Sequence, residues 1–215
     1  MSAKAGGPLG SGILGVPILD DFDRKELPIA NGKWAKTGWT EEIGSSWRRK
    51  WHGYGATLGN RSGAYWKGAV FSDSNGPVVT VATLGTGPIY ERWPNEYLSL
   101  WLDMPDPNKV RRAGYEVRFK GARRTDSAYA VELSKWVSGT RTVLAKAEGV
   151  SLPVDTKFAL SETRGSLAVW VGNSKLTRIL SATDSAYRGG YVGIEANRGE
   201  GTAYNFRAGN VRAPR

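Results

Sequence analysis

Side chains that commonly carry catalysis are few in this sequence, and they form no catalytic pattern. A retaining glycoside hydrolase holds two carboxylates about 5 to 5.5 Å apart, which acidic residues at alternate positions of one strand would supply. The acidic stretches, Glu132 and the segments 155–162 and 195–200, lack that alternation. The single histidine, His52, stands beside Trp51, and no Gly-x-Ser-x-Gly elbow offers it a nucleophile. The sequence therefore predicts a protein that is not an enzyme.

Metal and cofactor sites are equally hard to place. With no cysteine and one histidine, only oxygen ligands remain for a metal ion. The segment 73–76 (Asp-Ser-Asn-Gly) begins like a calcium-binding loop, but Leu84 occupies the twelfth position, where a bidentate Glu is needed. It is better interpreted as a hairpin turn. Glycines at 10, 12 and 15 match a dinucleotide-binding pattern by letter, yet Pro17 follows where a helix should run. We expect no metal and no cofactor.

Three tryptophans give the clearest indication of a binding surface. Trp101, Trp136 and Trp170 alternate with apolar residues, so in strands they would face away from the apolar side. Arg118 and Glu132 share that parity and would be their neighbours. An aromatic ring beside a charged hydrogen-bonding group can hold a sugar ring or anchor another protein, and packing within the chain is the third alternative. The sequence leaves all three open, with these five residues as the candidate site.

The elements that would position these residues are short strands. Apolar residues occupy every second position of several segments, which is the pattern of half-buried β-strands. The sets expected to face the core are Leu98, Leu100, Leu102 and Met104; Tyr115, Val117 and Phe119; Tyr129, Val131 and Leu133; Leu167, Val169 and Val171; and Val192 with Ile194. Hairpin turns are expected at 73–77, 137–140, 164–166 and 171–173. Residues 33–66 predict one or two strands with long loops.

The chain of 215 residues suits one sandwich domain, which we place at 17–215. Residues 1–16 are rich in glycine and lack periodicity, so they predict a flexible, extended N-terminal arm. Its apolar residues Leu9, Ile13 and Leu14 would contact a neighbouring subunit. We therefore expect the chain to work within a homo- or hetero-oligomeric assembly.

The net charge of +10 favours an anionic partner, either an acidic polysaccharide or an acidic protein, although a well-solvated surface would also explain it. The basic residues form local clusters rather than the continuous stripe of a nucleic-acid groove, so no specific nucleic acid is expected. No apolar run approaches the roughly 18 residues of a membrane helix, and we expect no membrane insertion. The N-terminal residues also lack a signal-peptide pattern, which predicts synthesis in a cytoplasm without cleavage.

The order of the segments resembles a known family. An opening ILDDFDR is followed by YEVRFKG, YAVELSKWVSGTRTVLAKA, a GGYVGIEAN strand and a closing NFRAGNV. This is similar to the concanavalin A-like, laminin-G-like jelly roll over about residues 18–211. The resemblance implies an all-β fold of two antiparallel sheets in which the opening Asp-Phe strand pairs with the closing strand. These motifs mark the fold and carry no chemistry.

Within that family the chain resembles minor tail proteins of phages that infect actinobacteria, which often begin with a glycine-rich arm and an Asp-Asp-Phe-x-Arg strand, here residues 20–24. The resemblance implies a non-enzymatic virion structural protein made in the host cytoplasm, a minor tail or other exposed component. Its partners would be other virion proteins and a host-surface glycan. The alternatives are a secreted bacterial carbohydrate-binding module, a capsid decoration protein and, last, a glycoside hydrolase.

Overall fold

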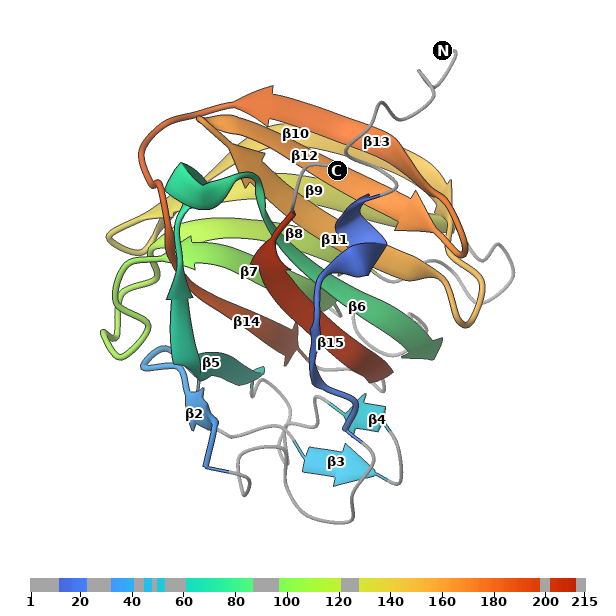
Figure 1. The fold of residues 1–215 in the computed structure, drawn as a ribbon, viewed down its shortest axis with the longest axis horizontal. Coiled ribbons are helices and arrows are strands. Elements are labelled where there is room, and N and C mark those ends of the chain that lie inside the picture. The colour runs from blue at the N-terminus through green and yellow to red at the C-terminus, as the bar shows by residue number, and fades with distance from the viewer. Residues whose placement is uncertain are drawn as a thin grey trace.

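The computed structural model describes residues 12–22, 32–40, 45–47, 50–52, 61–86, 97–120, 128–197 and 202–211. These residues form a two-sheet antiparallel jelly-roll sandwich, as the sequence predicts. Figure 1 shows the two sheets stacked face to face. Within these ranges, no helix has the length and apolar character that a membrane-crossing segment needs.

The first sheet has eight strands. In spatial order they are β13 (Leu176–Thr183), β12 (Ser166–Gly172), β11 (Lys157–Thr163), β6 (Val78–Thr86), β15 (Thr202–Asn210), β4 (Lys50–His52) and β3 (Ser45–Trp47), with β1 (Ile18–Asp20) also paired to β15. The second sheet has seven strands, in the order β10 (Thr140–Ser151), β9 (Ala128–Val137), β8 (Gly114–Lys120), β7 (Tyr97–Met104), β14 (Gly190–Asn197), β5 (Arg61–Phe71) and β2 (Trp34–Lys36). Two short 3-10 helices complete the described elements, η1 (Ile13–Gly15) and η3 (Asp73–Asn75).

The core lies between the sheets and consists of the residues that the alternation predicts. Leu98, Leu100 and Leu102 of β7 belong to it, as do the predicted residues of β8, β9, β12 and β14. The rings of Phe119 on β8 and Phe158 on β11 meet across the two sheets, with centroids 4.7 Å apart. The period-two pattern therefore predicted correctly which face of each of these strands is buried.

Met104 is the exception among the predicted core residues. Asp103 has a positive φ of 53°, and the pairing of β14 with β7 shifts register between Tyr191 and Gly193. An irregularity of this kind reverses the alternation beyond it. Met104 consequently packs with Trp101 on the outer face of the second sheet rather than between the sheets.

Two of the predicted turns are tight hairpins. At Ser138-Gly139 and Arg164-Gly165 both central residues have positive φ, which is the geometry of a two-residue hairpin turn. The strands β12 and β13 are also joined by a turn, but it lies at 173–175, two residues beyond the predicted 171–173. The prediction of a hairpin at 73–77 is wrong, because β5 and β6 belong to different sheets. That segment forms η3, with the Ser72 side chain accepting a hydrogen bond from the Ser74 amide.

The region 33–66 holds β2, β3, β4 and the start of β5, more strands than the sequence predicts. Three of them have only three residues, too short for a legible alternation. Trp34 of β2 is buried and packs edge-on against Phe206 of β15, with ring centroids 5.0 Å apart. This short strand is therefore fixed by one large side chain rather than by its length.

The opening strand pairs with the closing strand, as the resemblance implies. In this pair Ile18 faces Arg207 and Asp20 faces Phe206. The Asp20 carboxylate accepts hydrogen bonds from the Phe22 amide at 2.8 Å and from the Trp34 indole at 2.7 Å. These bonds turn the buried Phe22 ring into the core, where it contacts Trp34. The Asp-x-Phe sequence thus closes one end of the sandwich.

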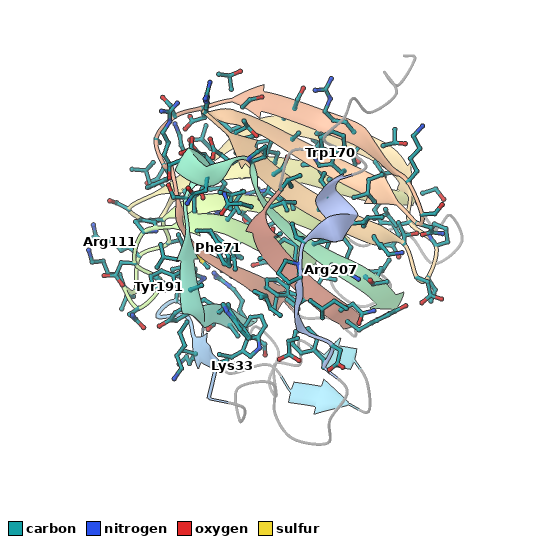
Figure 2. The ribbon with its side chains drawn as sticks, in the orientation of Figure 1. Lys33, Phe71, Arg111, Trp170, Tyr191 and Arg207 are labelled. Carbon is teal, nitrogen blue, oxygen red and sulfur yellow. The ribbon has the colours of Figure 1, made fainter. Side chains whose placement is uncertain are left out.

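Residues 12–16 pack on the outer face of the first sheet, where Figure 1 shows η1 in blue lying across the front strands. Ile13 is fully buried and shares an apolar cluster with Val16 and Trp170. Arg207 donates hydrogen bonds to the carbonyl oxygens of Leu14 and Val16 (Figure 2). The expectation of an extended arm over 1–16 is therefore wrong for this part, and Ile13 is not available to a neighbouring subunit. Leu9 lies outside the described residues.

Candidate binding face on the second sheet

The outer face of the second sheet gathers charged side chains from neighbouring strands. The strand register places Glu132 of β9 opposite Arg118 of β8, Arg118 opposite Ser99 of β7, and Ser99 opposite Glu195 of β14. One row across four strands thus carries the charges of Glu132, Arg118 and Glu195, with the neutral Ser99 between the last two. In the next row Trp101 faces Glu116. Because these residues alternate with core residues, the same pattern that builds the core also builds this face.

Glu195 is the centre of a buried hydrogen-bond network. Its side chain is 1% exposed and accepts hydrogen bonds from Arg112 Nη2 at 2.5 Å, the Tyr97 hydroxyl at 2.7 Å and Trp39 Nε1 at 3.0 Å. Arg112 arrives from the loop after β7, and the Gly139 amide of the β9–β10 hairpin donates to its carbonyl oxygen. Two loops and two strands, β7 and β14, are therefore joined at one carboxylate.

The protonation states within this network follow from burial and charge. Burial by itself lowers the pKa of Arg112, but Glu195, Tyr97 and Glu116 together outweigh it and the pKa of the guanidinium is raised. Burial also raises the pKa of the Tyr97 hydroxyl, and the negative charge of Glu195 raises it further. Arg112 is thus charged and Tyr97 is neutral at physiological pH, so both serve as donors to Glu195.

A second group of ion pairs covers the β8–β10 side of the face. Glu116 accepts hydrogen bonds from Arg118 Nε and Trp136 Nε1, both at 2.8 Å. Glu132 accepts hydrogen bonds from Lys120 and Arg141, both at 2.7 Å. Burial alone would raise the pKa of Glu132, but these two hydrogen bonds outweigh it and lower the pKa. The carboxylate is therefore charged at neutral pH.

Aromatic rings pack among these charges. Trp101 is 1% exposed, and its ring centroid lies 5.1 Å from that of Trp39 and 6.1 Å from that of Trp136. The Arg112 guanidinium lies 4.7 Å from the Trp136 ring centroid and 5.7 Å from that of Trp101. Trp39 and Trp136 are only half-buried. Two indole rings therefore line the solvent side of a buried charged layer. We call this surface the aromatic–ionic face: Trp39, Tyr97, Trp101, Arg112, Glu116, Arg118, Glu132, Trp136, Arg141 and Glu195.

The structure brings together four of the five candidate residues, namely Trp101, Trp136, Arg118 and Glu132. Trp170 lies on the opposite sheet, 3% exposed beneath η1, and its Nε1 donates to Ser161 Oγ at 2.8 Å. Both Trp101 and Trp170 do face away from the core. For these two the structure shows packing within the chain, one of the three alternatives that the sequence left open.

Sequence reasoning missed six members of the face, one of which is Arg141 of β10. Glu116, Glu195 and Tyr97 were within its reach, because each alternates with predicted core residues on its strand. Arg112 and Trp39 come from irregular loops, where no periodicity reveals which way a side chain points. Arg111, beside Arg112 in sequence, is exposed and points outward in Figure 2. Nothing in the sequence distinguishes these two arginines.

Among the residues that the structure describes, no three side chains of the metal-ligating types lie close enough together to hold a metal ion.

A scan of protein-family models gives no match, and a sequence search of curated proteins gives none either. Solved structures are similar in fold. The exoplasmic/lumenal domain of VIP36 in its Ca²⁺- and mannose-bound form is similar over 89% of this chain and 90% of its own, with a TM-score of 0.63 and 12% identity.

Two further structures extend this likeness. The legume lectin-like domain from Entamoeba histolytica is similar over 92% of this chain and 99% of its own, with a TM-score of 0.60 and 11% identity. The carbohydrate-binding module CBM66 from Bacillus subtilis is similar over 83% of this chain and 93% of its own, with a TM-score of 0.52 and 16% identity. At such low identity the likeness establishes the legume-lectin-like jelly-roll fold.

Proposed function

We propose that this chain is a carbohydrate-binding domain that holds a glycan on its aromatic–ionic face without cleaving it. The observation that carries the proposal is the pair of half-exposed indoles, Trp39 and Trp136, above charged side chains fixed by buried hydrogen bonds. The C–H faces of a sugar ring pack on an aromatic face, while fixed polar groups orient its hydroxyls. The similar folds of a mannose-bound lectin domain and a carbohydrate-binding module support this proposal.

The hydrogen bonds of the three carboxylates support binding rather than hydrolysis. Glu116, Glu132 and Glu195 each accept hydrogen bonds through both oxygens from side chains of this chain. A glycoside hydrolase needs one carboxylate as nucleophile or base and another as acid, both facing the glycosidic bond. With their oxygens engaged by internal donors, these three carboxylates fix the arginine and indole side chains in place.

Trp136→Ala is expected to weaken glycan binding at least tenfold, about 1.4 kcal/mol, because it removes one of the two half-buried rings on which the sugar is proposed to stack. Binding is measured on a glycan array and then by titration calorimetry with the best ligand. Tyr204→Ala is the matched control, since Tyr204 is a half-buried aromatic residue on the opposite sheet. Unchanged affinity in a folded Trp136→Ala protein would show that the glycan does not bind on the aromatic–ionic face. Trp101 is unsuitable for this test, because it is buried.

We further propose that the domain belongs to a virion, as a minor tail or other exposed component made in the host cytoplasm. The support is the resemblance of residues 20–24 and of the glycine-rich N-terminal segment to actinobacterial phage tail proteins. A secreted bacterial carbohydrate-binding module and a capsid decoration protein are the alternatives, and both would keep the same binding face. The three differ in what residues 1–11 contact.

Deletion of residues 1–11 tests the virion proposal. The truncated chain 12–215 keeps Ile13 and Val16, which pack on the first sheet, so it is expected to fold with the unfolding temperature of the full chain. It is also expected to be absent from purified virions in a complementation assay, while the full chain is incorporated. Equal incorporation of both forms would show that the segment makes no assembly contact.

A further inference from the structure

The spare hydrogen-bonding capacity of the aromatic–ionic face lies in its donors. Within the described part of the chain, Trp101 Nε1 and the Nε and Nη1 atoms of Arg112 are buried without a hydrogen-bond partner. By contrast, Glu116, Glu132 and Glu195 already accept hydrogen bonds through each oxygen. The acceptors of the face are therefore used internally, and its donors are left for something else.

Arg112 is the most informative of these donors. Its side chain is 4% exposed, and only Nη2 contacts Glu195 and the Tyr97 hydroxyl. A buried donor without a partner destabilises the unliganded protein, and more so when it is charged. A ligand that supplies acceptors to Nε and Nη1 recovers this free energy on binding. Arg112 and Trp101 lie together, since the guanidinium is 5.7 Å from the Trp101 ring centroid.

The charges on and beside the face also favour an anionic ligand. Within the face the cations of Arg112, Arg118 and Arg141 balance three carboxylates, and Lys120, which lies beside the face and pairs with Glu132, adds a fourth positive charge. A neutral sugar hydroxyl presents a donor together with its acceptor lone pairs, whereas an oxyanion presents acceptors alone and carries the opposite charge. The net charge of +10 on the whole chain also attracts an anionic polymer.

We infer that the glycan held by this face carries an oxyanion, a carboxylate or a sulfate on the sugar, whose oxygens accept hydrogen bonds from Arg112 and Trp101. This inference rests on the proposed function and names its ligand class. The Trp136 ring lies against the Arg112 guanidinium, so the oxyanion reaches the guanidinium only when this ring gives up its hydrogen bond to Glu116 and moves aside. Binding accordingly changes the fluorescence of Trp136.

The test compares matched ligands on the unaltered full chain. An array presents each oligosaccharide as a pair, the uronic or sialic acid form and the same oligosaccharide with its carboxyl reduced to an alcohol, together with sulfated forms of equal length. The charged member is expected to bind at least tenfold more tightly, with an affinity that falls as salt rises. Preference for the carboxylated or the sulfated form identifies which oxyanion is recognised.

Each other outcome has a defined meaning. Equal binding of the charged and neutral members, or preference for the neutral one, overturns the inference and leaves carbohydrate binding intact. Binding to no glycan on the array overturns the proposed function itself.

A conservative variant then assigns the role to Arg112. Arg112→Lys keeps a positive charge for Glu195, and with it the fold, but removes the Nε and Nη1 donors. It is expected to bind the charged and the neutral member of each pair with equal affinity, so that the tenfold preference is lost. Arg178→Gln is the control, because it removes an exposed charge from β13 of the opposite sheet and should change nothing. A lysine variant that still discriminates tenfold contradicts the assignment.

Discussion

Glu195→Ala is expected to lower the free energy of unfolding by about 3 to 5 kcal/mol, the cost of breaking a buried ion pair by removing one partner. Without Glu195 the guanidinium of Arg112 stays buried with no carboxylate to accept its hydrogen bond. The Tyr97 hydroxyl and the Trp39 indole lose the same acceptor. Equilibrium urea unfolding, followed by tryptophan fluorescence, measures the loss.

Glu132→Ala is the matched control for this change. Glu132 also accepts two hydrogen bonds from cationic side chains, but Lys120 is 37% and Arg141 20% exposed, so water can replace the lost carboxylate. Its removal is expected to cost about 1 kcal/mol, as for solvent-accessible pairs. If the two variants lose the same stability, Glu195 is not the structural centre of the face.

The second large effect is a pH dependence that originates at Asp103. This residue is fully buried at the end of β7, and neither of its carboxylate oxygens accepts a well-formed hydrogen bond within the described residues. Burial, and then the nearby negative charge of Glu162, raise the pKa of Asp103 from 3.8 to about 7. The folded protein therefore holds a proton on Asp103 that the unfolded chain has already released at pH 5.

The sign follows from linkage, since stability falls with pH wherever the folded state binds more protons. The contribution of Asp103 is complete below about pH 4 and is lost as pH rises to about 7, a loss of about 4 kcal/mol at 1.36 kcal/mol per pKa unit. Glu162, whose pKa burial also raises, acts in the same direction. The lowered pKa values of Glu132 and Asp184 act oppositely, because their stabilisation disappears only as pH falls into the acid range.

Asp103→Asn isolates this contribution. The amide imitates the protonated acid, so the variant is expected to match the parent protein near pH 4 and to exceed its stability by about 4 kcal/mol at pH 8. Urea unfolding across pH 4–8 measures both proteins, with Asp106→Asn in the half-exposed loop that follows β7 as the control. If the free energies of unfolding of Asp103→Asn and of the parent protein change with pH in parallel, the proton is bound at another residue.

The sequence revealed the sandwich because its strands obey one simple physical rule. A strand that buries one face alternates strictly, so residues such as Val117 and Leu133 identify the core without any knowledge of their partners. The same rule located Trp101 and Glu132 on the outer face. It does not predict whether a residue on the outer face is exposed to solvent, because that depends on loops that fold back over the sheet.

The sequence predictions that were wrong or incomplete have two causes, a local change in backbone conformation and contacts made by loops. One positive φ, at Asp103, reverses the direction of Met104, and no residue type signals it as glycine would. Arg112 and Trp39 complete the charged network from irregular segments. Packing of η1 on the first sheet likewise depends on Trp170, more than a hundred residues further along the chain. Sequence patterns are local, and these contacts are not.

The pairing of β1 with β15 has a consequence for biogenesis. As the chain leaves the ribosome, Ile18 and Asp20 emerge early but have no strand to join until residues 202–210 have been made. Phe22 and Trp34 must wait equally long for Phe206. Contacts so distant in sequence slow the final closure, so nearly the whole polypeptide exists before the native state becomes reachable. Nascent chains stalled before β15 would thus expose apolar side chains to chaperones.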